Sequence, residues 1–264
     1  MKVHVLIENS TSRDDLVAEH GLSLLIETES GTRVLFDAGA TPAFAENAER
    51  MGVDLSAVDV AVLSHGHNDH GGGLLQFMEL NTHAPVWVTP HAFDAHYNAN
   101  GREIGLPGEW KALSRFRVAG HDALSLATGV TLLRATDMPM LFSAEGAGMK
   151  AVVHGRLVAD DFRHEQYLLI EEKGKKVLFS GCSHRGILNI ASYFKPDILV
   201  GGFHYMRCDA VADAERLKQA AQLLLTLPTL YYTGHCTGET AMSILSPVMG
   251  ERLQYLSTGI TLEI

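Results

Sequence analysis

The stretch SHGHNDHGGG, Ser64 to Gly73, places three histidines and one aspartate within six positions, directly before three glycines. Packing gives no reason for such a cluster, because neighbouring imidazoles repel one another when charged and need separate partners when neutral. A shared cation supplies a reason, since imidazole and carboxylate suit Zn²⁺, Fe²⁺, Mn²⁺ or Co²⁺. A solvated histidine-rich turn is the alternative, but the strand pattern before the stretch and the glycines and helix pattern after it favour a metal-binding loop.

The four candidate ligands in this stretch are too many for one open catalytic metal. In an extended loop, the side chains of His65 and His67 can point the same way. Asp69 and His70 then lie at the start of the next helix and turn toward a neighbouring point, while the glycines leave room for a crowded turn. The spacing therefore predicts two metal ions that share one loop.

The chain of 264 residues is long enough for one large α/β domain, and no linker or repeat divides it. We therefore expect a single domain over residues 1–264. Residues 91–120 lack a clear period, and we interpret them as an insertion or lid beside the site, with a long surface loop as the alternative. Strands are predicted at 3–8, 21–27, 32–37, 58–64, 85–89, 129–135, 150–155, 166–172, 175–181, 197–202, 229–234, 253–256 and 259–264, and helices at 41–53, 72–80, 184–194, 209–227 and 238–250.

Charge and cysteine content narrow the functional classes. The formal charge of −10 disfavours a nucleic-acid partner, because the chain would repel a polyanion. No apolar run approaches the roughly 20 residues that span a bilayer, so no membrane partner is expected. The N-terminus lacks the pattern of a signal peptide, and three cysteines at wide spacing do not form a disulfide framework. We expect a cytoplasmic protein, and whether it forms a homo-oligomer stays open.

Several motifs together resemble a known family. HGHNDH is similar to the HxHxDH signature of the metallo-β-lactamase superfamily, and LFDAGA (Leu35–Ala40) resembles its strand that ends in Asp and Gly. GLSLLIE, LSHGHNDHGGGL, FSGCSHRGI, GGFH and TGHCTGE resemble the branch of metal-dependent hydrolases related to 7,8-dihydropterin-6-methyl-4-(β-D-ribofuranosyl)-aminobenzene-5′-phosphate synthase. The resemblance implies a four-layer αββα sandwich with two mixed β-sheets and a metal site at strand ends along one edge.

The resemblance also implies roles for individual residues. His65 and His67 fall where the superfamily holds its first metal, whereas Asp69 and His70 fall where it holds the second. His235, in TGHCTGE, matches the final metal-binding histidine, with a capping or surface histidine as the alternative.

The chain departs from the family pattern at FSGCSH. Many relatives place a bridging aspartate where this chain has Cys182, and we expect His184 to complete the first metal site. His154 and His164 are the nearest candidates for a further upstream histidine ligand, but neither has the expected surroundings. Cys182 is either a thiolate ligand or a small buried residue beneath the site, and burial is the commoner fate of a free cysteine.

Two further residues complete the predicted site. Asp37 is expected behind the ligands, where it would accept a ring N–H and fix that imidazole's orientation; a simple turn aspartate before Gly39 is the alternative. His204 follows a predicted strand and could be a ligand, a proton donor to a leaving group or a structural imidazole; service beside the substrate or behind the ligands is favoured. Asp69 could also steer a proton, so Asp69 and His204 are the catalytic candidates.

These expectations favour a binuclear hydrolase that attacks a small ester, lactone, thioester or phosphoester through a metal-bound hydroxide. The expected cofactors are two divalent ions, Zn²⁺ first, with Fe, Mn or Ni as alternatives, and the partner is a small molecule of phosphorylated or pterin-like type. The branch resemblance leaves open a transferase that joins a dihydropterin to a ribosyl-aminobenzene phosphate and expels pyrophosphate. A non-catalytic metal-containing sensor or binding protein is the third possibility.

Overall fold

Two seven-stranded mixed sheets form the centre of the computed structural model, which describes residues 1–144, 146 and 148–264. The first sheet has the order β17 (Thr261–Glu263), β1 (Lys2–Ile7), β2 (Ser23–Glu27), β3 (Arg33–Phe36), β4 (Val60–Val62), β5 (Val86–Val88), β7 (Phe116–Val118). The second has the order β16 (Leu253–Tyr255), β15 (Leu230–Thr233), β14 (Ile198–Val200), β13 (Lys175–Phe179), β12 (Tyr167–Glu172), β9 (Val130–Leu133), β8 (Ala123–Ala127).

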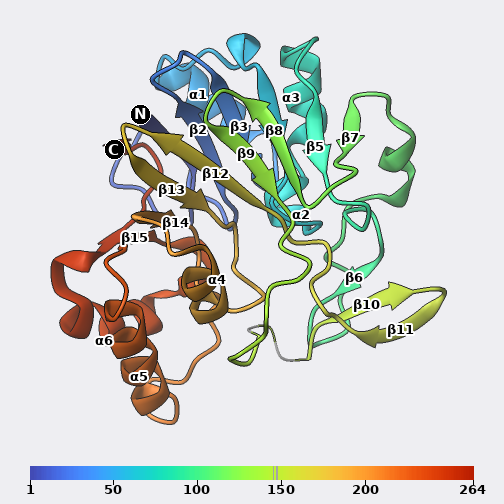
Figure 1. The fold of residues 1–264 in the computed structure, drawn as a ribbon. Coiled ribbons are helices and arrows are strands. Elements are labelled where there is room, and N and C mark those ends of the chain that lie inside the picture. Colours follow the sequence, from blue (N-terminus) through green and yellow to red (C-terminus); the bar gives the residue numbers. More distant parts are fainter. Residues whose placement is uncertain (145, 147) are drawn as a thin grey trace.

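Helices cover the outer face of each sheet (Figure 1). The first sheet carries α1 (Ala43–Arg50) and α3 (Leu74–Leu80), and the short α2 (Asn68–Gly71) precedes α3. The second sheet carries α4 (Ile187–Phe194), α5 (Ala214–Leu225) and α6 (Glu239–Met249). Short 3-10 helices complete the set: η1 (Leu55–Ala57), η2 (Gly108–Ala112), η3 (His235–Thr237) and η4 (Gly250–Arg252).

Strict alternation along the strands produces these layers. Val34 and Phe36 of β3 belong to the core between the two sheets, whereas Leu35 packs under the helices of the first sheet. In the second sheet, Phe179 faces the same central core, whereas Leu178 packs beneath the second set of helices. Because successive side chains of a strand point to opposite faces, each buried strand contributes to two cores. The predicted αββα fold class is confirmed.

The parallel strands of both sheets end at one edge. In the first sheet β3, β4, β5 and β7 run parallel, and in the second β13, β14, β15 and β16 do. Since the carboxyl ends of parallel strands lie on the same side, the loops after β3, β4, β13, β14 and β15 converge there. These loops contain the predicted site residues.

The segment 91–120 contains more structure than the sequence indicates. It forms β6 (His96–Tyr97), η2 and β7, and β7 extends the first sheet at its edge. β6 also joins a small third sheet, in the order β11 (Arg156–Ala159), β10 (Lys150–Val153), β6, which projects from the sandwich (Figure 1). The role of this segment as a lid stays a prediction.

Some boundaries also differ from the prediction. The helix expected over 72–80 begins at Leu74, and the one expected over 209–227 begins at Ala214. Within the described residues, no helix is long and apolar enough to cross a bilayer.

Candidate metal centre

The predicted site residues all lie along the sheet edge where the parallel strands end. Asp37 follows β3, His65 and His67 follow β4, and Asp69 and His70 belong to α2. From the second sheet, Cys182 and His184 follow β13, His204 follows β14, and His235 follows β15. All are buried except the partly exposed Asp69. The two sheets thus supply opposite walls of one site.

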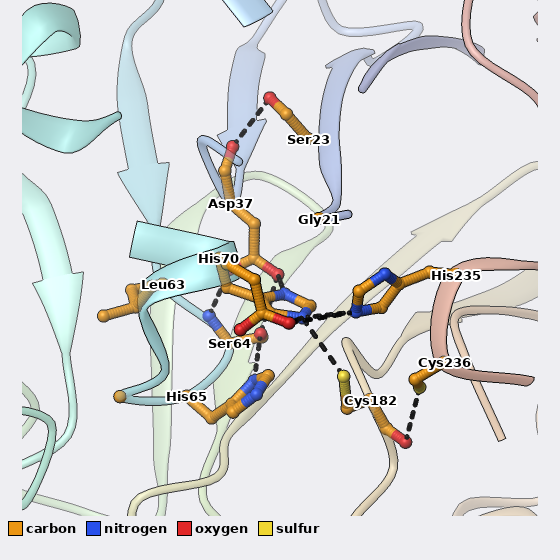
Figure 2. Close-up of polar contacts among 12 residues, drawn as sticks. Gly21, Ser23, Asp37, Leu63, Ser64, His65, His70, Cys182, His235 and Cys236 are labelled. Atoms are coloured by element: carbon orange, nitrogen blue, oxygen red, sulfur yellow. Dashed lines mark hydrogen bonds and ion pairs between the residues drawn. The ribbon is translucent and has the colours of Figure 1, made fainter. Parts of the chain in front are cut away.

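One cluster of donor atoms is centred on His70 (Figure 2). Its Nδ1 lies 2.6 Å from Asp37 Oδ2, whereas its Nε2 lies 3.1 Å from both Cys182 Sγ and His235 Nε2. His235 Nδ1 lies 2.9 Å from Asn9 Oδ1. Both Nδ1 atoms face oxygen acceptors and therefore carry the proton in the neutral ring, so both Nε2 atoms direct lone pairs at each other. A cation between them would satisfy both.

Asp69 joins this cluster from the solvent side. Its Oδ2 lies 3.5 Å from His235 Nε2 and 4.0 Å from His70 Nε2. Burial would raise the pKa of Asp69, but the surrounding imidazoles outweigh it and hold that pKa well below its usual range. The carboxylate is therefore ionised, as a metal ligand must be.

The second cluster joins His65 to His184. Ser64 Oγ donates to Asp37 Oδ2 (2.7 Å) and can accept from His65 Nδ1 (2.8 Å). With its proton on Nδ1, the neutral His65 ring has an unprotonated Nε2, and this atom lies 3.2 Å from His184 Nε2. Asp37 thus orients one imidazole of each cluster, His70 directly and His65 through Ser64, which is the arrangement typical of residues behind metal ligands.

Cys182 lies where the two clusters meet. Its Sγ is within 4.8 Å of donor atoms of His65 and His184, and also of His70 and His235. Burial raises the pKa of the Cys182 thiol well above its usual range, and the neighbouring Cys236 raises it further. In the part of the chain that the structure describes, no cysteine forms a disulfide. Cys182 is thus buried, as the sequence favoured, and its sulfur can reach donor atoms of both clusters. Whether it is a ligand stays a prediction.

His67 lies near the second cluster, as the spacing predicts, but it also contacts a separate group of buried residues. Its ring centroid is 4.6 Å from that of His65 and 4.8 Å from that of His184. Its donor atoms nevertheless lie within 4.8 Å of those of His96, Asp160 and His164, and its buried Nε2 has no hydrogen-bond partner among the described residues.

The neighbours of His67 form a buried network, of which the sequence analysis considered only His164 as a ligand. Asp160 Oδ2 lies 3.0 Å from His96 Nδ1 and 3.3 Å from His164 Nε2, although the latter pair makes no hydrogen bond. His164 Nδ1 accepts the backbone N–H of Gly66 at 3.0 Å, between the first two histidines of the loop. His164 thus binds the backbone of the ligand loop and makes no hydrogen bond to His65 or His184. His96 and Asp160 do not end strands of the two large sheets, so no spacing signal indicated them.

His20 and Glu165 also belong to the site without having been predicted. His20 Nε2 lies 3.4 Å from Asp69 Oδ2, and its ring lies 4.6 Å from that of His235. Glu165 accepts the backbone N–H groups of His184 (2.7 Å) and Arg185 (3.1 Å). Burial raises the pKa of Glu165 to about 7. Both residues precede strands, a position at which sequence alone gives no indication of function.

Three of the predicted site residues have a strained backbone. Asp37 (φ 61°), His204 (φ 56°) and His235 (φ 47°) are non-glycine residues in the left-handed region. Such conformations cost about 1–3 kcal/mol each and persist only where surrounding contacts fix them. His204 lies with its ring 4.3 Å from that of His184, and burial, followed by the charge of Arg207, lowers its pKa to about 4.

The electrostatics of the histidines suit a bound cation. Burial lowers the pKa values of His65, His67 and His184 well below the ordinary range, so these rings are neutral and have lone pairs available. Burial alone would lower the pKa of His70 too, but the carboxylates of Asp37 and Asp69 outweigh it and raise that pKa. The convergent lone pairs, the unpartnered buried ring nitrogens of His67 and His184, and the ionised carboxylate fit divalent ions.

A cavity of about 410 Å³ opens over these residues. Its floor includes His67, Asp69, Cys182, His184 and His204, and the remaining wall is formed by His20, Ala40, Asn68, Asn98, Arg102, Ile104, Met149, Met206, Arg207 and Cys236. Asn98, Arg102 and Ile104 come from the segment 91–120, so this segment borders the site.

Comparison with known proteins agrees with this geometry. The sequence profile of the metallo-beta-lactamase superfamily matches residues 16–133. The crystal structure of Tm1679, a metal-dependent hydrolase of the beta-lactamase superfamily, superimposes with a TM-score of 0.84 at 27% identity, covering 100% of this chain and 99% of that one. In sequence profile and in fold, the chain is similar to members of the metallo-β-lactamase superfamily.

The chain is also similar to two other proteins of known name. It is 29% identical to 7,8-dihydropterin-6-methyl-4-(beta-D-ribofuranosyl)-aminobenzene-5′-phosphate synthase of Methanocaldococcus jannaschii, over 98% of this chain and 95% of the relative. Zn²⁺-bound PqqB from Methylobacterium extorquens shares the fold, with a TM-score of 0.61 at 14% identity over the full length of both chains. The metallo-β-lactamase fold implies divalent metal binding, and most of the superfamily are metal-dependent hydrolases.

Proposed function

We propose that this protein is a binuclear metal-dependent hydrolase that acts in the cytoplasm on a small ester, lactone, thioester or phosphoester. The observation that supports it is the position of Cys182 Sγ between two clusters of convergent imidazoles. His65, His67 and His184 would hold the first ion, and Asp69, His70 and His235 the second, with Cys182 between them. Zn²⁺ is the first candidate, because imidazole and thiolate suit it; Fe, Mn and Ni accept the same donors.

Divalent ions held in this way lower the pKa of water and polarise a scissile carbonyl or phosphoryl group. The chain's own residues would do the rest. Asp37 fixes the orientation of His70 and, through Ser64, of His65. The ionised Asp69 can accept a hydrogen bond from the attacking water. His204, neutral at pH 7 because its pKa is lowered to about 4, can donate a ring N–H to charge that develops on the leaving group.

The test combines elemental analysis with a substrate panel. Protein purified without chelators should contain about two divalent ions per chain and should hydrolyse some of a panel of esters, lactones and phosphodiesters, with the activity lost on chelation. The double variant His67→Ala/His235→Ala should lose metal at one or both sites, whereas His83→Ala, an exposed histidine away from the cavity, should retain it. Full metal occupancy in the double variant would refute the ligand assignment.

A transferase is the second candidate, and the identity with the Methanocaldococcus jannaschii synthase favours it. In that case the ions would hold a leaving pyrophosphate. Incubation with a dihydropterin and an aminobenzene phosphate together, and with each alone, separates the two. Consumption of one compound alone, with water as acceptor, supports hydrolysis; product that forms only from the pair supports transfer. Bound metal without turnover of any compound would indicate a sensor or binding protein.

A further inference from the structure

Two arginines stand at the mouth of the cavity over the metal centre. Arg102 follows β6, in the segment 91–120, and Arg207 follows β14 in the second sheet. Both are exposed, whereas the candidate ligands on the floor are buried, apart from the partly exposed Asp69. The guanidinium groups therefore lie at the entrance, above the position where a bond would be broken.

Neither guanidinium has an ion pair or side-chain hydrogen bond with any residue that the structure describes. The contacts of the Arg102 segment are made by its backbone: Arg102 N–H donates to Asn98 Oδ1 (3.0 Å) and Asn98 N–H donates to the Arg102 carbonyl (2.9 Å). Arg207 acts on the site through its charge, which helps to lower the pKa of His204. Two unpaired cations at one opening are notable in a chain with 31 acidic and 21 basic residues.

The remaining charges and walls of the cavity agree with an anionic ligand that has an apolar body. Among the described residues that line it, Asp69 is the one carboxylate, and it faces His20 and His235. Ile104, Met149 and Met206 supply apolar surface to the cavity lining. Guanidinium groups bind phosphate oxygens in a planar, two-point geometry, and two of them match the charge of a phosphate monoester.

We propose that Arg102 and Arg207 bind a phosphate monoester group that the substrate carries away from its scissile bond. This inference rests on the proposed function, because it places that bond at the metal centre. The arginines would then select phosphorylated substrates and orient their apolar body toward the floor, while the phosphate itself stays intact.

Phenyl phosphate is a suitable probe, and calorimetry on the metal-loaded protein measures its binding. Arg102→Gln and Arg207→Gln should each weaken binding about tenfold or more, the loss expected when a charge-assisted hydrogen bond is removed. Lysine at either position should recover part of it. Arg156→Gln, on the exposed strand β11 away from the cavity, removes the same charge and should leave the affinity unchanged. Binding should also weaken with added salt, because the pair is exposed.

The outcomes separate this inference from the proposed function. Failure of the protein to bind phenyl phosphate, or unchanged affinity in both glutamine variants, would overturn the inference; binding that vanishes only on chelation would show that the phosphate sits on the ions. Benzoate bound as tightly as phenyl phosphate would overturn the phosphate assignment. Arginine-dependent binding by a protein that holds no metal and hydrolyses nothing would leave the arginine site standing and refute the proposed function instead.

Discussion

At the scale of single residues, Cys182 is the most informative position. Its sulfur lies 3.1 Å from His70 Nε2 and within reach of both histidine clusters. Burial makes an isolated thiolate there unfavourable, as the raised pKa of the thiol indicates. A metal ion reverses that preference, because a coordinating thiol loses its proton. The same side chain is thus an inert buried thiol without metal and a candidate ligand with it.

This dual character leads to a direct prediction. Cys182→Ala should lower metal affinity by tenfold or more, whereas Cys182→Asp should retain two ions and shift preference toward harder ions such as Mn²⁺. Metal content after dialysis against graded chelator measures both effects. In the cobalt-substituted protein, a sulfur-to-metal charge-transfer band should be present in the wild type and absent from either variant. Cys208→Ala, outside the cavity, is the matched control. Wild-type metal content and an unchanged cobalt spectrum in Cys182→Ala would mean that the sulfur only packs beneath the site.

The sequence could indicate the ligand loop but not every contact that its residues make. Packing does not explain three histidines between positions 65 and 70, so the sequence alone indicates a cation site there. His67, by contrast, lies against His96, Asp160 and His164, which come from chain segments about 30 to 100 residues away. Such contacts depend on tertiary packing and leave no pattern in local spacing.

At the scale of elements, close backbone packing holds the ligand loop against its neighbours. A Cβ atom at Gly66 would lie 2.3 Å from the carbonyl oxygen of Ala92, and one at Gly72 would lie 2.1 Å from that of Ala40. Neither position has a left-handed backbone. Glycine is required there because another segment of backbone occupies the space that a side chain would need.

Gly66→Ala should therefore displace the loop between His65 and His67. We expect a loss of about 1–3 kcal/mol in the free energy of unfolding, as for other overpacked sites, together with weaker metal binding. Gly120→Ala is the control, because a Cβ there meets no atom within 4 Å and its backbone is ordinary. Denaturant unfolding and metal analysis of both variants make the comparison. Equal stability and metal content in the two would contradict the close packing described here.

Elements with two buried faces were predictable, and short edge elements were not. β12 and β13 have continuous apolar runs, so their existence followed from the sequence. β6 has two residues and β11 is exposed throughout, so neither has a hydrophobic pattern to detect. They form because other strands offer hydrogen-bonding partners, which is a tertiary effect.

At the scale of the whole molecule, the buried histidines link folding to pH. Burial lowers the pKa of His235 to about 4 from an ordinary value of 6.5, and those of His65, His67 and His184 fall in the same direction. The unfolded chain therefore takes up protons below pH 6.5 that the folded metal-free chain does not. Stability is consequently lost as pH falls from 6.5 toward 4.

The metal-free protein should show this loss as a steep fall in melting temperature between pH 7 and pH 5. His235 alone would contribute about 3 kcal/mol by pH 4, from its shift in pKa. Bound metal should raise the melting temperature and move the fall to lower pH, because ions bind the neutral rings. Thermal unfolding with and without chelator over this range measures both effects. A flat profile for the chelated protein would show that the rings are not buried as neutral groups.

The net charge of the chain does not describe the charge at the cavity mouth. The net charge of −10 correctly describes an acidic chain, yet the cavity mouth carries two arginines. The net charge does not reveal where individual arginines lie. Arg102 and Arg207 line one cavity only because the two sheets pack face to face.

The pairing of β1 with β17 has a consequence for synthesis on the ribosome. Val3 lies opposite Leu262, so β1 waits during synthesis for a strand about 260 residues later before its outer edge is covered. Until then the nascent chain exposes an apolar strand edge that could recruit another copy. Chaperone demand during translation should therefore fall once residues 261–263 leave the exit tunnel.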